Sequence, residues 1–366
     1  MKKILFFINN LGSGGAQRQL VELAKGYKEL GYNVKILIYQ ELWSEYYISH
    51  ISEFGVTVDG IYERKYIKRI WLLRKYLLKN KFDVIISFLE TPCFYVEIAG
   101  LFIKRWKLIV GERSADPSKC TRLILRIFIY FHLLSDYIVA NSQANIDIIK
   151  SITRVIPEKK FRVIYNMYDV NKIRRENFEY NIWHENNRFK LLIASSHRYL
   201  KNLNGLVEAV NLLEENLKQK LQILWYGSNL FDDSLYDAKV KITKYHLDSV
   251  FEFYEPTLDI YKYMSNADAI GLFSFFEGLP NAICEAMLLE KPVIVTTVSD
   301  IPILLKDNVN GFLCNPDDPI SIASAIRKVL HCTPEELSLM GANNRQLAQE
   351  IFSKEKVLSQ YAELFD

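Results

Sequence analysis

Short apolar runs alternate with helix-length stretches along almost the whole chain. Runs of roughly four to eight apolar residues bounded in this way are typical of strands buried on both faces of a parallel sheet. In the first half of the chain they cover residues 4–8, 34–39, 84–87, 108–111 and 137–140. The pattern begins again in the second half, with runs at 190–195, 222–226, 250–253, 269–273 and 292–296. The sequence therefore predicts an α/β fold made of two doubly wound units.

A polar stretch with few apolar residues separates the two sets of strands, from about residue 169 to residue 188. We predict an N-terminal domain at 1–169, a linker at 170–189 and a C-terminal domain at 190–350. The last helix, at about 351–366, is expected to join the first domain. Two open α/β units are expected to leave a cleft between them, and such clefts bind ligands.

Composition and the chain ends narrow the class of protein. With 366 residues, 49% hydrophobic and 24% charged, the chain has the mix of a soluble globular protein, and intrinsic disorder is excluded. The apolar run at 4–8 is too short for a signal peptide, and the tract at 123–134 is far short of the ~20 residues of a membrane span. The five cysteines are scattered and form no CxxC pair, which indicates neither a disulfide framework nor a zinc site. We expect a cytoplasmic protein that does not cross a membrane.

A glycine-rich turn follows the first predicted strand. Gly14 and Gly15 stand just before an apolar-periodic helix, where backbone N–H groups at a helix N-terminus can contact a phosphate. The dinucleotide fingerprint needs a third small residue where this chain has Gln17, so an NAD-dependent dehydrogenase is the least favoured enzyme class. Phosphate contact and a tight turn that only packs the helix are equally compatible with the sequence.

An acidic segment in the second half is the richest in candidate chemistry. It follows the strand at 269–273, and Pro280 is expected in the first turn of a helix. Glu277 then lies in the preceding loop and Glu285 about one and a half turns inside the helix. Such a corner can bind a diphosphate, with carboxylates accepting hydrogen bonds from sugar hydroxyls. The equally weighted alternative is an acid near a helix N-terminus and an exposed glutamate inside the helix.

These residues resemble a known family. Glu277 and Glu285 have the spacing of the E-x7-E motif of retaining family 4 glycosyltransferases, and the surrounding FSFFEGLPNAICEAMLLEKPVIVTTVSDIP and NVNGFL are similar to that family's donor-binding core. SSHRYLKN at 195–202 is similar to its Arg/Lys loop, and VIYNMYD at 163–169 resembles the segment that ends its first domain. The resemblance implies a GT-B fold, with two Rossmann-like doubly wound domains facing each other across a cleft.

The resemblance also assigns roles in donor binding. Arg198 and Lys201 would bind the donor diphosphate and neutralise the charge that develops on the leaving group. No DxD is present, which favours a metal-independent reaction without a cofactor. The three-residue spacing from Arg198 to Lys201 is shorter than in many members, and without the resemblance both would be assigned to a solvated loop.

The remaining roles concern the sugar and the acceptor. The resemblance implies that Glu285 binds the ribose and Glu277 the transferred sugar, while Gly278 and Leu279 offer backbone contacts. GSGGAQR, which includes Arg18, and the loop 112–114 look like members that act on lipid-linked acceptors. Glu112 and Arg113 either contact the acceptor or brace their loop, and the sequence leaves both alternatives open.

The first half of the chain is basic and aromatic. Residues 1–170 hold 26 Lys and Arg against 16 Asp and Glu, whereas residues 171–366 hold 20 against 27. Residues 64–81 contain eight Lys and Arg, no acid, and apolar residues at helical intervals. This pattern favours a helix on the anionic surface of the inner membrane, with a packed helix bearing a solvated charged face as the alternative. Nucleic acid is not expected as a partner, because no recognised motif is present and the second half is acidic.

Taken with the sequence features above, the resemblance implies a retaining, metal-independent hexosyltransferase, and we expect it at the cytoplasmic face of the inner membrane. The expected reaction moves a sugar from a nucleotide donor to a glycan or polyprenyl-diphosphate-linked acceptor. UDP is the expected nucleotide on family frequency, and O-antigen or capsule assembly is the expected pathway. The alternatives are a nucleotide-sugar epimerase of similar fold and a non-catalytic nucleotide-sugar-binding protein.

Overall fold

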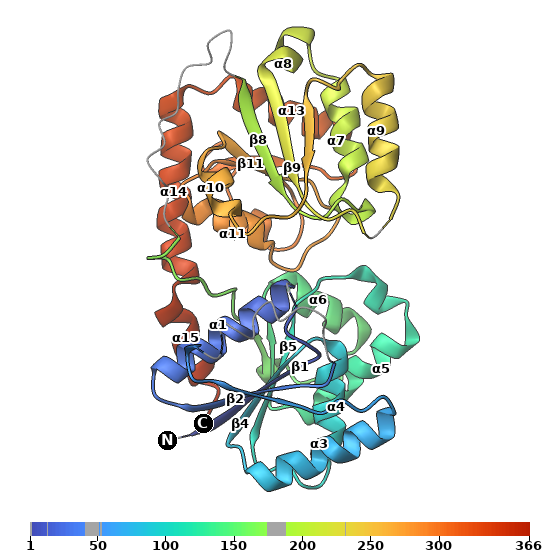
Figure 1. Ribbon diagram of the computed structural model, residues 1–366, viewed down its shortest axis with the longest axis vertical. Coiled ribbons are helices and arrows are strands. Elements are labelled where there is room, and N and C mark those ends of the chain that lie inside the picture. The colour runs from blue at the N-terminus through green and yellow to red at the C-terminus, as the bar shows by residue number, and fades with distance from the viewer. Residues whose placement is uncertain (1, 13, 41–50, 52, 174–187, 231) are drawn as a thin grey trace. The chain divides into compact units, whose positions relative to one another are not determined.

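The computed structural model describes residues 2–12, 14–40, 51, 53–173, 188–230 and 232–366 (Figure 1). They divide into two units: Met1–Tyr168 with Phe352–Asp366, and Asp169–Ile351. Residues 174–187, most of the predicted linker, lie outside the described part of the chain. Both units are built on parallel sheets, which confirms the predicted fold class.

The first unit has a seven-stranded sheet in the order β3-β2-β1-β4-β5-β6-β7. Its strands are β1 (Lys3–Ile8), β2 (Asn33–Ile38), β3 (Thr57–Gly60), β4 (Val84–Phe88), β5 (Lys107–Glu112), β6 (Tyr137–Ala140) and β7 (Phe161–Val163). One face packs on α1 (Gly15–Glu29) and α15 (Lys354–Ala362), and the other on α3 (Tyr66–Asn80), α4 (Glu90–Gly100), α5 (Leu123–Phe131) and α6 (Gln143–Ile152). The reversal of strand order lies between β1 and β4.

The second unit has a six-stranded sheet in the order β10-β9-β8-β11-β12-β13. Its strands are β8 (Phe189–Ala194), β9 (Leu221–Tyr226), β10 (Phe251–Tyr254), β11 (Ala269–Leu272), β12 (Val293–Thr296) and β13 (Gly311–Cys314). Its helices are α7 (Leu203–Asn211), α8 (Glu215–Lys220), α9 (Ser234–Lys244), α10 (Ile260–Ser265), α11 (Asn281–Leu288), α12 (Ile301–Leu304), α13 (Pro319–Leu330) and α14 (Pro334–Phe352). Strand order reverses between β8 and β11, and ligands bind outside the carboxyl ends of strands at such a point.

The ten predicted strands all form, with each end shifted by at most one residue. The prediction missed β3, β7 and β13, which lie at the edges of the two sheets. β3 has the sequence TVDG and β7 has only three residues, so neither shows a continuous apolar run. An edge strand pairs on one side only and is covered less completely, which weakens its hydrophobic signal.

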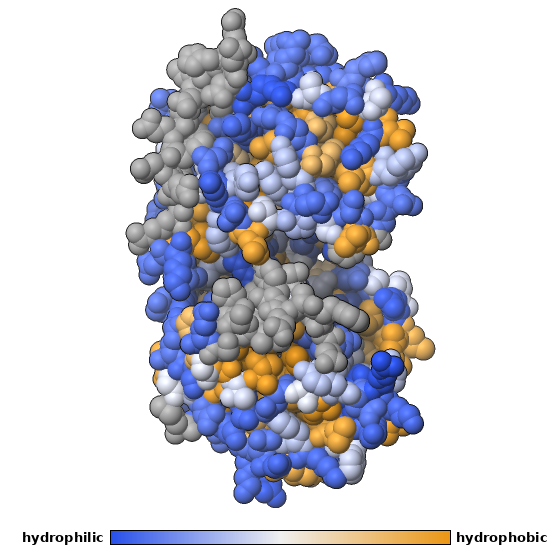
Figure 2. Space-filling view, viewed as in Figure 1, coloured by the Kyte–Doolittle hydropathy of each residue, from blue (hydrophilic) through white to orange (hydrophobic). Residues whose placement is uncertain are grey.

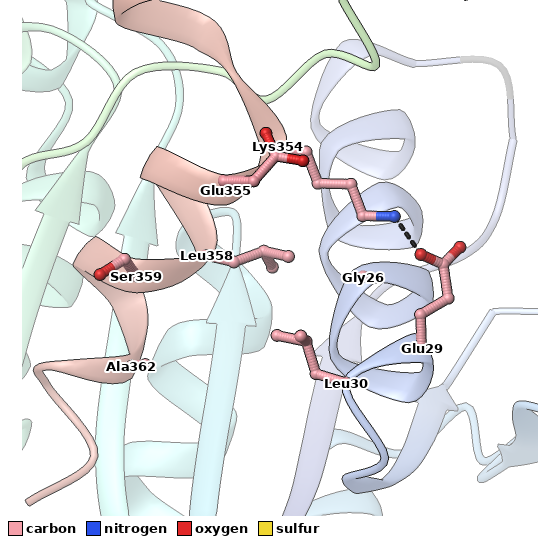
Figure 3. Close-up of a pocket in the computed structure, with 8 residues that line it drawn as sticks. All are labelled: Gly26, Glu29, Leu30, Lys354, Glu355, Leu358, Ser359 and Ala362. Atoms are coloured by element: carbon pink, nitrogen blue, oxygen red, sulfur yellow. Dashed lines mark hydrogen bonds and ion pairs between the residues drawn. The ribbon is translucent and has the colours of Figure 1, made fainter. Parts of the chain in front are cut away.

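The C-terminal helix α15 packs against α1, and the two line an open pocket (Figure 3). Leu358 is buried in the groove between them, and a Cβ on Gly26 would lie 2.8 Å from its Cδ1. The hydroxyl of Tyr27 donates to the Leu358 carbonyl at 2.7 Å, and Lys354 forms an ion pair with Glu29. The helices approach this closely because α1 carries a glycine at the contact.

We therefore expect Leu358→Ala to destabilise the first unit selectively. Removing a buried leucine side chain at a close helix contact costs about 2–5 kcal/mol of unfolding free energy. Differential scanning calorimetry should show the transition of the first unit at a lower temperature, with that of the second unit unchanged. Leu339→Ala in α14 is the matched control, since Leu339 is 63% exposed. Equal effects of the two substitutions would contradict this packing.

Candidate active site

Two neighbouring strands of the second unit end in loops that are joined to each other. The loop after β8 covers 195–202 and the loop after β11 covers 273–280. The Phe275 N–H donates to the Leu200 carbonyl at 3.0 Å, and the rings of Tyr199 and Phe275 stack with centroids 5.1 Å apart. The Arg/Lys loop and the first part of the acidic segment therefore form one structure at the point of strand reversal.

An ion pair lies where these loops meet. The Lys201 ammonium pairs with Glu277, and the Ser274 hydroxyl donates to the same carboxylate oxygen at 2.7 Å. The side chains of Lys201 and Glu277 are 13% and 14% exposed, so a solvated loop does not describe Lys201. The backbone turns tightly here, with the Lys201 N–H donating to the Arg198 carbonyl at 2.8 Å. This 3₁₀ turn explains how a lysine only three residues after Arg198 reaches Glu277.

Glu285 lies on α11 and is 5% exposed. The alternative of an exposed helix glutamate is therefore wrong. The Tyr261 hydroxyl, from α10, donates to Glu285 Oε1 at 3.3 Å. The prediction that Pro280 stands in the first helical turn is corrected by one position, because α11 begins at Asn281 and Pro280 is the extended residue before it.

The backbone between the two glutamates is held by its neighbours. The Ser299 hydroxyl donates to the Gly278 carbonyl, and the Leu279 side chain is buried. These contacts involve the Gly278 carbonyl and the Leu279 side chain, and donor contact by the two N–H groups stays a prediction.

The loop after β8 is fixed at both of its ends. Gly227, which follows β9, lies so close to Ser195 that a Cβ would be 1.9 Å from the Ser195 carbonyl oxygen. The Trp225 indole N–H donates to that oxygen at 2.8 Å. At the other end, Asn202 has left-handed backbone with φ 57° and donates to the Pro316 carbonyl at 2.7 Å. These contacts preorganise Arg198 and Lys201.

Sequence reasoning missed the polar partners of the two glutamates. Ser274 and Ser299 lie inside the segment that resembles the donor-binding core, but the sequence analysis assigned no role to either. Tyr261 lies outside that segment, 24 residues away from Glu285, and has no local signal because it meets the site only through folding.

The glycine turn belongs to the first unit. Gly14 is the extended residue before α1, and its carbonyl accepts from the Arg18 N–H at 3.0 Å. The Gln17 amide bonds to the side chains of Asn9 and Asn10 at 3.4 and 3.3 Å. The Arg18 guanidinium lies 5.6 Å from the Tyr168 ring centroid. The turn is thus held by its own side chains, and phosphate contact at Gly14 and Gly15 stays a prediction.

Glu112 is part of a buried charged network. Its carboxylate binds Lys119 through one oxygen and His132 Nε2 at 3.0 Å through the other, and it is 1% exposed. Lys119 continues to Glu90 at 2.7 Å, and His132 Nδ1 continues to Glu97 at 2.7 Å. Of the two alternatives that the sequence left open for Glu112, the structure favours the brace, because both oxygens are occupied inside the fold.

Arg113 also makes internal contacts. Its guanidinium lies 3.8 Å from the Phe88 ring centroid and donates to the hydroxyl of Tyr361 and, at 3.5 Å, to Asn166. These contacts tie the end of β5 to α15. The bracing alternative therefore accounts for the contacts of Arg113, and acceptor binding by this side chain stays a prediction.

Within the described ranges, no three His, Cys, Asp or Glu side chains are grouped so that they could hold a metal ion. None of the helices that the structure describes is both long and apolar enough to span a bilayer.

The joined loops carry Arg198, Lys201 and Glu277, and Glu285 follows on α11. Together with two doubly wound units, these features are those of a GT-B glycosyltransferase. The family model described as "Glycosyltransferase Family 4" matches residues 13–172, and "Glycosyl transferases group 1" matches residues 174–347. The chain belongs to the family 4 glycosyltransferases and is a glycosyltransferase.

Curated relatives span nearly the whole chain. A Campylobacter jejuni "GalNAc-alpha-(1->4)-GalNAc-alpha-(1->3)-diNAcBac-PP-undecaprenol alpha-1,4-N-acetyl-D-galactosaminyltransferase" is 26% identical over 90% of this chain and 89% of its own. A second from that organism, an "N-acetylgalactosamine-N,N'-diacetylbacillosaminyl-diphospho-undecaprenol 4-alpha-N-acetylgalactosaminyltransferase", is 23% identical over 98% of this chain and 97% of its own.

Solved structures share the fold. Anabaena Alr3699/HepE in complex with UDP superposes with a TM-score of 0.84 at 20% identity, covering 99% of this chain and 98% of its own. TarM superposes with a TM-score of 0.77 at 12% identity, covering 100% of this chain and 99% of its own.

The buried network predicts a pH dependence of stability in the first unit. Burial alone would lower the pKa of His132, but Glu97 and Glu112 outweigh it and raise that pKa to about 10. Because the folded pKa lies above the ordinary value of 6.5, the stabilisation is complete below about pH 6.5 and is lost as pH rises towards 10. The melting temperature of the first unit should therefore fall between pH 6.5 and pH 9.

The matched variant for this measurement is His132→Gln, which cannot titrate. It should be less stable than the parent protein at pH 6.5, and its melting temperature should depend less on pH across the same interval. An unchanged slope in this variant would show that His132 is not the titrating group.

Proposed function

We propose that this chain is a retaining glycosyltransferase that moves a sugar from a nucleotide donor, with UDP as the first candidate, to a polyprenyl-diphosphate-linked saccharide. The observation that carries the proposal is the joined pair of loops at the β8–β11 reversal, where Lys201 pairs with Glu277. UDP-bound structural neighbours support a nucleotide-sugar donor, and the polyprenyl-linked acceptors named in two relatives support the acceptor class.

In the proposed complex the cationic loop binds the diphosphate. Arg198 and Lys201 neutralise the charge that develops on the departing nucleotide diphosphate, which lowers the barrier to its release. The pairing with Glu277 orients the Lys201 ammonium before the donor arrives. No divalent ion is required for this charge balance, and we propose a metal-independent reaction without a cofactor.

The two glutamates bind different parts of the donor. Glu285 is held by Tyr261 on the buried side of α11 and accepts from the ribose hydroxyls. Glu277 lies on the loop before that helix and accepts from hydroxyls of the transferred sugar, with the N–H groups of Gly278 and Leu279 near the phosphates. A carboxylate that is already paired and partly desolvated loses little conformational entropy on binding.

Retention is proposed to follow front-face attack. The bond from the anomeric carbon to the phosphate oxygen breaks, and the acceptor oxygen forms its bond on the same face. The leaving phosphate takes the proton of the acceptor hydroxyl, so no enzyme nucleophile is needed.

The acceptor is assigned to the first unit. Its basic charge suits a diphosphate-linked lipid, with Arg18 and Arg113 as candidate acceptor contacts, whereas Gly14 and Gly15 are proposed to contact the donor phosphates. The helix α3 covers most of the basic segment 64–81, and we propose that it rests on the anionic cytoplasmic leaflet of the inner membrane. Assembly of O-antigen or capsule is the pathway that this acceptor class suggests.

The first test is nucleotide binding by thermal shift. UDP, GDP, ADP and CMP are added without metal to the parent protein and to Glu285→Ala. At 100 times its dissociation constant a ligand stabilises the fold by ~2.7 kcal/mol. We expect a shift with UDP that is lost in Glu285→Ala and kept in Glu335→Ala, an exposed glutamate of α14. The absence of any shift in the parent protein would overturn the donor site.

The second test separates transfer from binding. Glu277→Gln should lower the rate of transfer by about 10²–10³-fold, because the sugar loses a charged acceptor and Lys201 loses its partner, while the affinity for UDP stays within a few-fold. Transfer is measured from labelled UDP-sugars into an extract of bacterial polyprenyl-diphosphate-linked saccharides. An epimerase would instead convert the donor without any acceptor, and a binding protein would leave it intact.

A further inference from the structure

Three helices of the first unit lie side by side over one face of its sheet. α4 is in the middle, flanked by α3 on one side and α5 on the other (Figure 1). Several large apolar side chains of α3 and α5 are exposed, and Figure 2 shows hydrophobic side chains interleaved with hydrophilic ones where α4 and α5 lie in this view.

Helix α5 presents an apolar face to solvent. Leu123 is 71% exposed, and Ile124, Ile127 and Tyr130 are 40–50% exposed, whereas only Ile129 of this nine-residue helix is buried. The exposed positions recur at helical spacing and therefore form one stripe. A soluble helix ordinarily turns such a stripe to the core, so this one is available to a partner.

The turn after α4 adds a fully exposed aromatic ring. Phe102 is 99% exposed and has left-handed backbone with φ 62°, which a bulky residue adopts only when its surroundings hold it there. Arg74 of α3 donates to the Leu101 carbonyl at 2.7 Å, and Lys104 donates to the Leu134 carbonyl, just after α5, at 3.1 Å. The turn that carries Phe102 is thus tied to the helices on both sides.

Helix α3 completes the surface with a second stripe. Ile67, Trp71 and Leu78 are exposed, and the Lys75 ammonium lies 3.6 Å from the Trp71 ring centroid. Trp and Lys in this arrangement suit the boundary between lipid headgroups and acyl chains.

Basic residues predominate around the stripes. Segments 64–81, 101–107 and 117–134 contain eight, three and three Lys or Arg, respectively, and no Asp or Glu. Lys119 is buried, and Lys68 and Lys104 pair with Glu63 and Asp136, so the remaining exposed cations carry the surface charge. An apolar surface framed by cations complements an anionic bilayer. A second copy of this chain docked by twofold symmetry would place like charges against each other, which disfavours self-association.

We infer that this surface enters an anionic bilayer, with α5 and Phe102 as the apolar anchor and α3 as the basic contact. The inference deepens the membrane association proposed for 64–81, because it assigns insertion to residues outside that segment. Apolar insertion resists salt, whereas contact through cations alone is screened as the Debye length shrinks.

The test is co-sedimentation of the full chain with vesicles of phosphatidylcholine, either pure or with 30% phosphatidylglycerol, at about 0.1 and 0.5 M NaCl. We expect binding to the anionic vesicles that persists in part at high salt. The anchor variant I124S/I127S/F102S should bind at least tenfold more weakly and lose the salt-resistant fraction. The control V240S/L339S changes exposed apolar residues of the second unit and should bind like the parent protein.

Two further measurements distinguish loss of membrane binding from loss of folding, and the apolar anchor from the basic contact. Retention of the UDP thermal shift in the anchor variant would show that it is folded, and the donor site is then judged independently of the membrane. The variant K68E/K75E should lower binding at low salt while leaving the apolar anchor intact.

Three results would overturn the inference. The first is an anchor variant that binds like the parent protein while K68E/K75E loses binding, which would leave α3 as the only membrane contact. The second is a parent protein that co-sediments with neither kind of vesicle and remains monomeric. The third is a parent protein that ignores them and forms dimers in analytical ultracentrifugation that the anchor variant does not form, which would assign the surface to self-association.

Discussion

The pairing of β8 with β11 is the constraint on which the candidate active site depends. These strands lie next to each other although 74 residues (195–268) separate the end of β8 from the start of β11, because the order of the sheet reverses at β8. Their carboxyl ends therefore deliver two loops to one place, and the loops join through the Phe275–Leu200 hydrogen bond. If β11 were paired elsewhere, Lys201 and Glu277 would not meet, and the cationic loop would have no carboxylate to orient it.

Partly buried charges are arranged differently in the two units. In the second unit the Lys201–Glu277 pair keeps 13% and 14% of its side-chain surfaces exposed, so solvent still reaches both charges. In the first unit Glu112 and His132 are sealed inside the fold, and each charge is matched by another. A sealed network of this kind defines one backbone arrangement around β5, because removal of any member would leave a buried charge without compensation.

The two faces of the first sheet serve different purposes. One is closed by α1 and α15, whose contact at Gly26 and Leu358 is close and apolar. The other is covered by α3, α4 and α5, which turn enough apolar surface inward to form a core and still leave apolar stripes outside. Hydrophobic residues that the core does not use cost solubility, and their position next to a predominantly basic surface supports the contact proposed above.

The sequence alone predicted ten strands of the two sheets, because their apolar runs signal each strand locally. It also placed Glu277 in the loop after β11 and Glu285 on the following helix, whose start was displaced by only one position at Pro280. The edge strand β3 and the partners Tyr261 and Ser299 gave no such signal, since their contacts join residues far apart in the chain.

Only the tertiary structure shows which residues of each segment face the core and which face solvent. The tract at 123–134 is apolar in sequence whether it is buried or exposed, and only the packing of Ile129 against the core turns Leu123 and Ile124 outward. Glu112 is a second example. Its position in the sequence allows either acceptor contact or bracing of its loop, and the contacts with Lys119 and His132 in the folded protein favour bracing. Periodicity is a property of neighbouring residues, whereas burial depends on which distant elements fill the space around them.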